Sequence, residues 1–199
     1  MIHSRLCRRS SALCWFLLCC ASLVCRCGAL SGHYYRIDVM LTELHNPKSL
    51  IHNGKRCDVF TACDPLLYVY IDTQKPRETF PGGARSQEDF TVLTSQYNSD
   101  TLTINRSLSK TICGSSSQAL PTDVTARVDA RDHDYFTGHD IMEEFNCSFV
   151  FRASWEGDYA WSEERPCKAR FHPLDISLRF KWRVIPITPE QCGQETVPA

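Results

Sequence analysis

The sequence predicts an all-β fold, an antiparallel β-sandwich of about eight strands. Apolar residues recur at every second position in several segments, and Gly, Pro, Ser and Asn occur in the connections between them. No long segment shows the period of an amphipathic helix. A chain of 199 residues has room for one domain of ordinary size. Because each strand would bury one face, we expect two sheets that pack face to face.

The clearest strand is expected near the end of the sequence. Five apolar residues alternate there with serine, arginine and lysine over 176–184. We expect Trp155 and Trp182 in the core. The segments 75–87 and 114–118 are expected to form surface loops. Further strands are expected at 35–41, 66–72, 90–93, 102–104, 124–130 and 149–155.

The first 29 residues have the layout of a secretory signal peptide. Three arginines precede the apolar run 11–25, and small residues follow it up to Ala29, where we expect cleavage. The run is too short to span a bilayer comfortably. A retained N-terminal anchor with palmitoylated Cys19 and Cys20 is the alternative. We therefore expect a secreted protein that lies outside the cell, peripheral to its surface.

Removal of the signal peptide 1–29 leaves a domain at 32–193 and a tail at 194–199. The chain carries 22 basic and 23 acidic residues, and four of the arginines lie in the signal peptide. The exported part therefore has 18 basic residues and a formal charge of −5. This balance argues against nucleic acid as a partner.

Twelve cysteines are present, and six of them lie inside the expected signal peptide. An even number of remaining cysteines in an exported chain predicts disulfides, although the sequence leaves their pairing open. A Cys57–Cys63 bridge is one possibility, and a cysteine metal site is disfavoured because no CxxC spacing is present. The sequons at Asn105 and Asn146 predict N-glycosylation. The cysteines expected to be oxidised are Cys57, Cys63, Cys113, Cys147, Cys167 and Cys192.

Two groups of aspartates adjoin predicted strands. One group comes directly before the strand 66–72, and the other follows the strand 124–130. Calcium prefers six to eight oxygen ligands, so a site needs several carboxylates that converge from folded-back loops. We therefore predict one Ca²⁺ site that the two groups share at one end of the sandwich. Its expected ligands are Asp58, Asp64, Asp132, Asp134 and Asp140.

These residues resemble calcium-dependent C2 domains. The segment 64–71 is similar to the C2 strand SDPYVKVYL, and Asp58 stands at the spacing of the first aspartate of C2 loop one. The segment 132–145 resembles the third C2 loop and its following strand. The resemblance implies a C2-type sandwich in which all five aspartates are calcium ligands.

C2 domains also place apolar residues between these ligands, where the side chains enter a bilayer. The resemblance therefore implies an anionic phospholipid surface as a partner. Packing of the apolar residues under their own loops is the alternative, and we expect His133 and His139 to face solvent. The apolar positions are Val59, Phe60, Tyr135 and Phe136.

A narrower resemblance covers roughly 31–193. The segments 31–37, 53–57, 63–69 and 178–185 resemble the N-terminal domain of Notch ligands (Delta, Serrate and Jagged), which is itself a C2-type sandwich. This resemblance implies a Notch-type receptor as a possible partner and a role in Notch-type signalling. In that family a receptor-binding module, EGF repeats and a transmembrane helix follow the domain.

We expect no enzymatic activity. The sequence contains no G-x-S-x-G, H-E-x-x-H, P-loop or G-x-G-x-x-G motif, and paired cysteines cannot act as nucleophiles. Asp132 and Asp134 could serve a glycosidase, but a calcium site accounts for five acids where catalysis accounts for two. The expected function is a secreted calcium- and phospholipid-binding recognition module. The alternative is a structural secreted sandwich that binds a protein or glycan without calcium.

Overall fold

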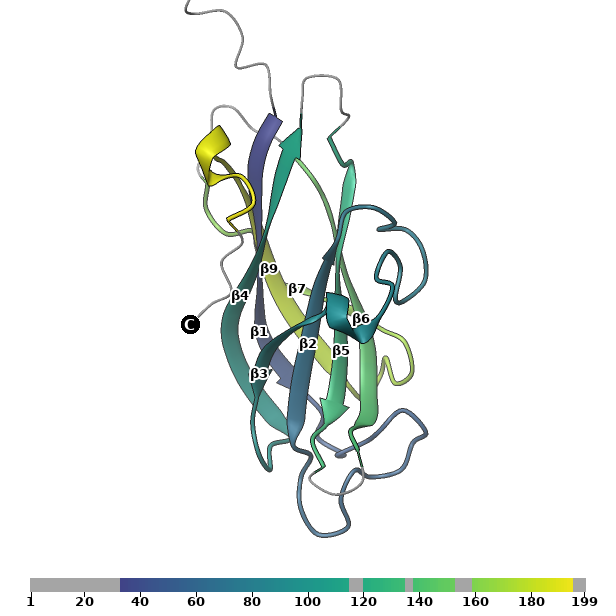
Figure 1. The fold of residues 1–199 in the computed structure, drawn as a ribbon. Helices are drawn as coiled ribbons and strands as arrows, with labels where there is room; N and C mark the ends of the chain where they lie inside the picture. The colour runs from purple at the N-terminus through teal and green to yellow at the C-terminus, as the bar shows by residue number, and fades with distance from the viewer. Residues whose placement is uncertain (1–32, 115–119, 135–137, 153–158, 195–199) are drawn as a thin grey trace, which may run out of the picture. The chain divides into compact units, whose positions relative to one another are not determined.

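The computed structural model describes residues 33–114, 120–134, 138–152 and 159–194 (Figure 1). The expected signal peptide, most of the tail, Tyr135, Phe136 and Trp155 lie outside the described residues. The chain divides into two units, Met1–Gly32 and His33–Ala199, and all described residues lie in the second. No membrane-spanning helix occurs in the part of the chain that the structure describes.

Nine strands in the described residues form two antiparallel sheets, which confirms the predicted all-β sandwich. Two 3-10 turns, η1 (Gln87–Asp89) and η2 (Pro189–Gln191), accompany them. The first sheet has the order β4 (Thr101–Gly114), β1 (His33–His45), β9 (Ser177–Pro186), β7 (Arg165–Pro166). The second sheet has the order β3 (Thr91–Ser95), β2 (Pro65–Asp72), β5 (Asp123–Asp132), β6 (Asp140–Val150), β8 (Lys168–Ala169).

Alternating residues of the strands build one core between the sheets. Ile37 and Leu41 of β1, Val69 of β2 and Phe180 of β9 are almost completely buried in the same cluster. Trp182 is half-buried and packs against this cluster, so its predicted core position holds in part. Burial of apolar surface is the main force that holds the two sheets together.

Two strands differ in length from the prediction. The segment 102–104 is only the beginning of β4, which continues to Gly114 because it pairs with β1 along the whole of that strand. The strand predicted at 149–155 overlaps only the end of β6, which begins at Asp140 and ends at Val150, and 153–155 lie outside the described residues.

The strand β5 is buried on both faces, although alternation predicted a solvent face. The Arg127 guanidinium donates to the carbonyl oxygens of Lys75 and Pro76, and the Thr125 hydroxyl also donates to Pro76. These residues belong to the connection between β2 and β3, which passes in front of β5 in Figure 1. The predicted loop 75–87 therefore covers the second sheet.

Three disulfides pair all six cysteines expected to be oxidised. Cys57–Cys63 closes the loop that precedes β2, and its Cα atoms are 5.5 Å apart. Cys113–Cys192 joins the end of β4 to the residue after η2. Cys147–Cys167 joins β6 to the residue between β7 and β8. The covalent links therefore connect the edges of the sandwich and stabilise the first acidic loop.

Candidate calcium site

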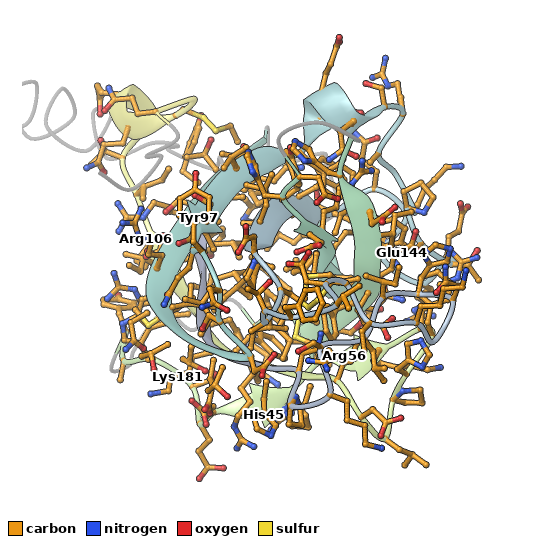
Figure 2. The ribbon with its side chains drawn as sticks, turned by 90° about the horizontal axis from the view of Figure 1, so that it is seen from below. His45, Arg56, Tyr97, Arg106, Glu144 and Lys181 are labelled. Atoms are coloured by element: carbon orange, nitrogen blue, oxygen red, sulfur yellow. A yellow bond between two sulfur atoms is a disulfide. The ribbon has the colours of Figure 1, made fainter. Side chains whose placement is uncertain are left out.

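The antiparallel pairing of three strands brings the aspartate loops to one end of the sandwich. The strand β5 pairs with β2 in a register that sets Asp132 opposite Pro65, directly after Asp64. It also pairs with β6, where Asp132 lies opposite Asp140. Figure 2 looks onto the lower end of the molecule in Figure 1, where β5 ends. Three of the five predicted ligands therefore stand side by side at strand ends.

Asp64 and Asp132 are in direct contact. The backbone N–H of Asp64 donates to Oδ1 of Asp132 over 2.6 Å, and the N–H of His133 donates to the carbonyl oxygen of Asp64 over 2.9 Å. The Asp64 carboxylate accepts a hydrogen bond of 2.6 Å from the N–H of Asn98. These bonds fix both carboxylates relative to the backbone.

Asp58 lies in the loop that the Cys57–Cys63 disulfide closes. Its Oδ2 accepts a hydrogen bond of 2.9 Å from the hydroxyl of Thr61. The same loop is attached to its neighbour, because the N–H of Ala62 donates to Oδ1 of Asn98. The Asn98 backbone and side chain therefore position two of the predicted ligands.

The contribution of Asn98 was missed by the sequence analysis. Asn98 adopts a positive φ of 50° in the turn between β3 and β4, a conformation that asparagine tolerates better than most residues. The polar run 96–100 could have marked a turn. The position of Asn98 beside Asp64 depends on how the strands β2 and β3 pair, which the sequence does not show.

Electrostatic repulsion concentrates on Asp132, which is only 1% exposed. Burial is the main cause that raises the pKa of its carboxyl to about 6; the hydrogen bond from the N–H of Asp64 opposes this shift, and the charges of Asp134, Asp58 and Asp64 add to it. In the described part of the chain, none of the five aspartates forms an ion pair with a basic side chain. The loop end therefore holds uncompensated negative charge.

The donor set suits a hard cation. All five predicted ligands offer carboxylate oxygens, which calcium prefers. Among the described residues, the single group of three potential ligands within 4.8 Å of one another is Cys57, Cys63 and Asp132, and the two disulfide sulfurs are not thiolates. The aspartates therefore gather at one end without three carboxylates meeting at one point, and Asp140 is exposed at the start of β6.

The apolar residues of the first loop project into solvent. The exposed fraction is 77% for Val59 and 96% for Phe60, so the alternative that they pack under their own loop does not hold for these two. Tyr135 and Phe136 lie outside the described residues. An exposed apolar tip beside clustered acids is the arrangement that the C2 resemblance implied.

The histidines of the second loop do not simply face solvent. The rings of His133 and His139 are half-buried and stack with their centroids 4.6 Å apart. The ring of Tyr97 meets that of His133 edge-on at 6.0 Å. The expectation that these rings face solvent therefore holds only in part, because each ring covers one face of the other.

The two sequons differ in their surroundings. Asn105 is exposed on β4 with a positive φ of 46°, where the pairing with β1 is irregular. Asn146 is half-buried on β6, and its side-chain oxygen accepts a hydrogen bond of 2.7 Å from Arg127. Glycosylation therefore stays a prediction, and Asn105 is the more accessible acceptor.

Comparisons with known proteins identify the fold. No protein-family model matches the sequence, and no curated protein sequence matches it. A C2 domain protein from Ramazzottius varieornatus superposes with a TM-score of 0.70 and 24% identity, over 84% of this chain and 97% of that one. Human GIVD cytosolic phospholipase A2 matches with a TM-score of 0.50 and 9% identity, over 78% of this chain and 17% of that one.

A structure of Drosophila C2-DSL-EGF1 also matches, with a TM-score of 0.46 and 14% identity, over 75% of this chain and 67% of that one. The similarity to the Ramazzottius varieornatus protein covers 97% of that C2 domain protein and 84% of this chain. The chain therefore has the fold of a C2 domain.

Proposed function

We propose that this chain is an extracellular C2-type recognition module that binds calcium through its aspartate loops and docks on anionic phospholipid. The contact between the Asp64 N–H and the Asp132 carboxylate carries the proposal, because two adjacent strands bring these residues side by side and neither forms an ion pair with a basic side chain in the described residues. Three disulfides are typical of a protein that folds in an oxidising compartment.

The residues of the chain have distinct roles in this proposal. Asp132 provides a buried carboxylate whose orientation the Asp64 N–H fixes, and Asp64 is held in turn by Asn98. Asp58, Asp134 and Asp140 complete the proposed set of calcium ligands. Bound calcium would supply the positive charge that this end lacks, and extracellular modules of this kind bind it with dissociation constants of about 10⁻⁴ to 10⁻³ M.

Membrane contact is assigned to the tip of the first loop. Val59 and Phe60 are exposed apolar side chains, and full burial of one phenylalanine contributes about 1.5–3 kcal/mol. Neutralisation of the acids would remove the repulsion between this end and anionic headgroups. A Notch-type receptor as a second partner rests on the sequence resemblance, and binding without catalysis is the proposed mode of action.

Calorimetric titration of calcium into chelator-treated protein tests the metal site. We expect saturable binding by the wild-type protein and its loss in Asp132→Asn, which keeps the acceptor for the Asp64 N–H but removes the charge. Glu163→Gln, a change of an exposed acid outside the loops, serves as the matched control and should bind like wild type. Absence of saturable calcium binding by the wild-type protein would favour the calcium-independent alternative, and equal binding by wild type and Asp132→Asn would show that Asp132 is not a ligand.

A further inference from the structure

A cavity separate from the aspartate loops lies at the edge of the sandwich where β6 approaches β9. A cavity of about 330 Å³ has walls formed by Val150 of β6, Trp182 and Arg183 of β9, Arg165 of β7, and the side chains of Arg152 and Tyr159. This volume falls within the range of small-ligand sites. Arginine and aromatic side chains thus share one pocket.

Two of the arginines are held by stacking on tryptophan rings. The Arg165 guanidinium lies 5.0 Å from the centroid of the Trp182 ring, and that of Arg183 lies 4.5 Å from the centroid of the Trp161 ring. Two hydrogen bonds fix this arrangement: the N–H of Ser162 donates to the carbonyl oxygen of Trp182 over 2.8 Å, and the N–H of Trp182 donates to the Ser162 hydroxyl over 3.0 Å. Stacking orders a guanidinium without using its N–H donors. Nε of Arg183 donates to Asp38, and its remaining N–H groups and those of Arg165 are left for an anion.

The pocket is strongly basic. Its described wall includes three arginines and no carboxylate. Arg183 shares Asp38 with Arg36, whereas Arg152 and Arg165 form no ion pair within the described ranges. The nearby Glu164 is paired with Arg179. A net positive pocket with ordered guanidinium groups suits an oxyanion, because arginine binds such groups through paired hydrogen bonds.

A second cavity adjoins the first and extends the basic surface. It has a volume of about 480 Å³ and shares Val150 and Arg165 with the smaller cavity. It adds Lys168, which also forms no ion pair in the described part of the chain. Its described wall contains two carboxylates, and both are ion-paired, Asp123 with Arg77 and Glu78 with Lys75. Two basic cavities joined through Arg165 match a ligand with several anionic groups along its length.

This edge is far from the aspartate loops. Asp140 and Val150 are the two ends of β6, which has 11 residues and therefore spans about 34 Å at about 3.4 Å per residue. The screening length at physiological ionic strength is about 8 Å. A bilayer that contacts the aspartate end would leave the basic edge open to a soluble polyanion.

We propose that this edge binds a sulfated polysaccharide, with sulfate groups against Arg152, Arg165 and Arg183 in one cavity and Lys168 in the next. Sulfate esters are the oxyanions that an exported protein meets on extracellular polysaccharides, and basic clusters are typical of heparin-binding surfaces. The polysaccharide site requires neither calcium nor the aspartate loops.

Chromatography of the folded, disulfide-bonded chain on immobilised heparin in the presence of chelator tests this proposal. We expect the wild-type protein to be retained at physiological ionic strength and Arg152→Gln/Arg165→Gln to elute at clearly lower salt. Calorimetry with soluble heparin should give a dissociation constant at least about tenfold weaker for the double variant, since charge-assisted hydrogen bonds are strong. Arg56→Gln/Arg106→Gln is the matched control, because both arginines are exposed and neither lines the two cavities. Figure 2 labels both residues.

The outcomes separate the possible ligands. Equal weakening by the two double variants would show general charge attraction and overturn the site. Equal binding of fully desulfated heparin would exclude sulfate recognition. The wild-type protein could instead fail to bind heparin but bind phosphoinositide vesicles in chelator. If the Arg152→Gln/Arg165→Gln variant lost that vesicle binding, the ligand of this site would be a lipid phosphate and not a polysaccharide. Because all samples contain chelator, failure here leaves the proposed calcium site untouched.

Discussion

Arg127 and Asp72 form an ion pair of 3.0 Å in which both side chains are completely buried. The arginine also donates to Asn146 and to two carbonyl oxygens, and the Asp72 carboxylate accepts hydrogen bonds from the N–H groups of Lys75 and Gly83. A side chain on Gly82 would overlap both charged groups, and this residue has a positive φ of 66°. The pair therefore anchors the connection between β2 and β3 on the second sheet.

Loss of one partner of this pair should strongly destabilise the fold. Arg127→Met leaves the Asp72 carboxylate buried without its counter-charge, and breaking such a pair costs about 3–5 kcal/mol. Urea denaturation should show this decrease in the free energy of unfolding. Arg77→Met is the control, because Arg77 is 81% exposed in its ion pair with Asp123 and should contribute at most about 1 kcal/mol. Similar losses in the two variants would show that the buried pair contributes no more than a surface one.

The raised pKa of Asp132 predicts how stability depends on pH in calcium-free buffer. The pKa of about 6 in the folded protein exceeds the ordinary value of 3.8, so the unfolded chain loses this proton first as the pH rises. The contribution of Asp132 to stability is therefore fully present below pH 3.8 and is lost as the pH rises through about 6. The free energy of unfolding decreases by about 3 kcal/mol over this range.

Asp132→Asn should remove this part of the pH dependence and stabilise the calcium-free protein at neutral pH. Urea denaturation in chelator at several values between pH 4 and about 7 measures the effect. Millimolar calcium should reduce the same pH dependence in the wild-type protein but not in the variant. An unchanged slope in Asp132→Asn would mean that Asp132 is not the group that titrates.

Particular residues show what the sequence could predict. The alternation over 176–184 predicted most of β9, and the positions of Asp64 and Asp132 beside predicted strands indicated a shared end, because β2 and β5 are neighbours in the sheet. Periodicity placed Arg127 on a solvent face, since it carries no information about a covering loop. The burial of Arg127 depends on contacts between β5 and the 73–86 segment, which lies far from β5 in the sequence.

Glu143 shows the same limit. Its buried carboxylate accepts hydrogen bonds from the N–H groups of Arg170, Phe171 and His172, which are far away in sequence. The sequence showed only an acid within a strand that resembles a C2 strand. The disulfide pairing was likewise open until the edges of the two sheets were placed relative to each other.

Vesicle co-sedimentation with and without calcium tests whether the aspartate loops bind anionic phospholipid through calcium. Wild-type protein should sediment with vesicles of phosphatidylserine and phosphatidylcholine only when calcium is present. Phe60→Ala should weaken this binding about tenfold or more while calcium affinity stays nearly unchanged, because its exposed ring supplies apolar contact. Asp134→Asn should lose both calcium and vesicle binding.

Leu174→Ala is the matched control, because Leu174 is 97% exposed and lies outside the calcium loops. It should sediment like wild type, which would show that the effect of Phe60→Ala depends on its place in the loop. We expect calcium-dependent sedimentation that Phe60→Ala weakens and Asp134→Asn abolishes. Failure of the wild-type protein to sediment at millimolar calcium would contradict the membrane role.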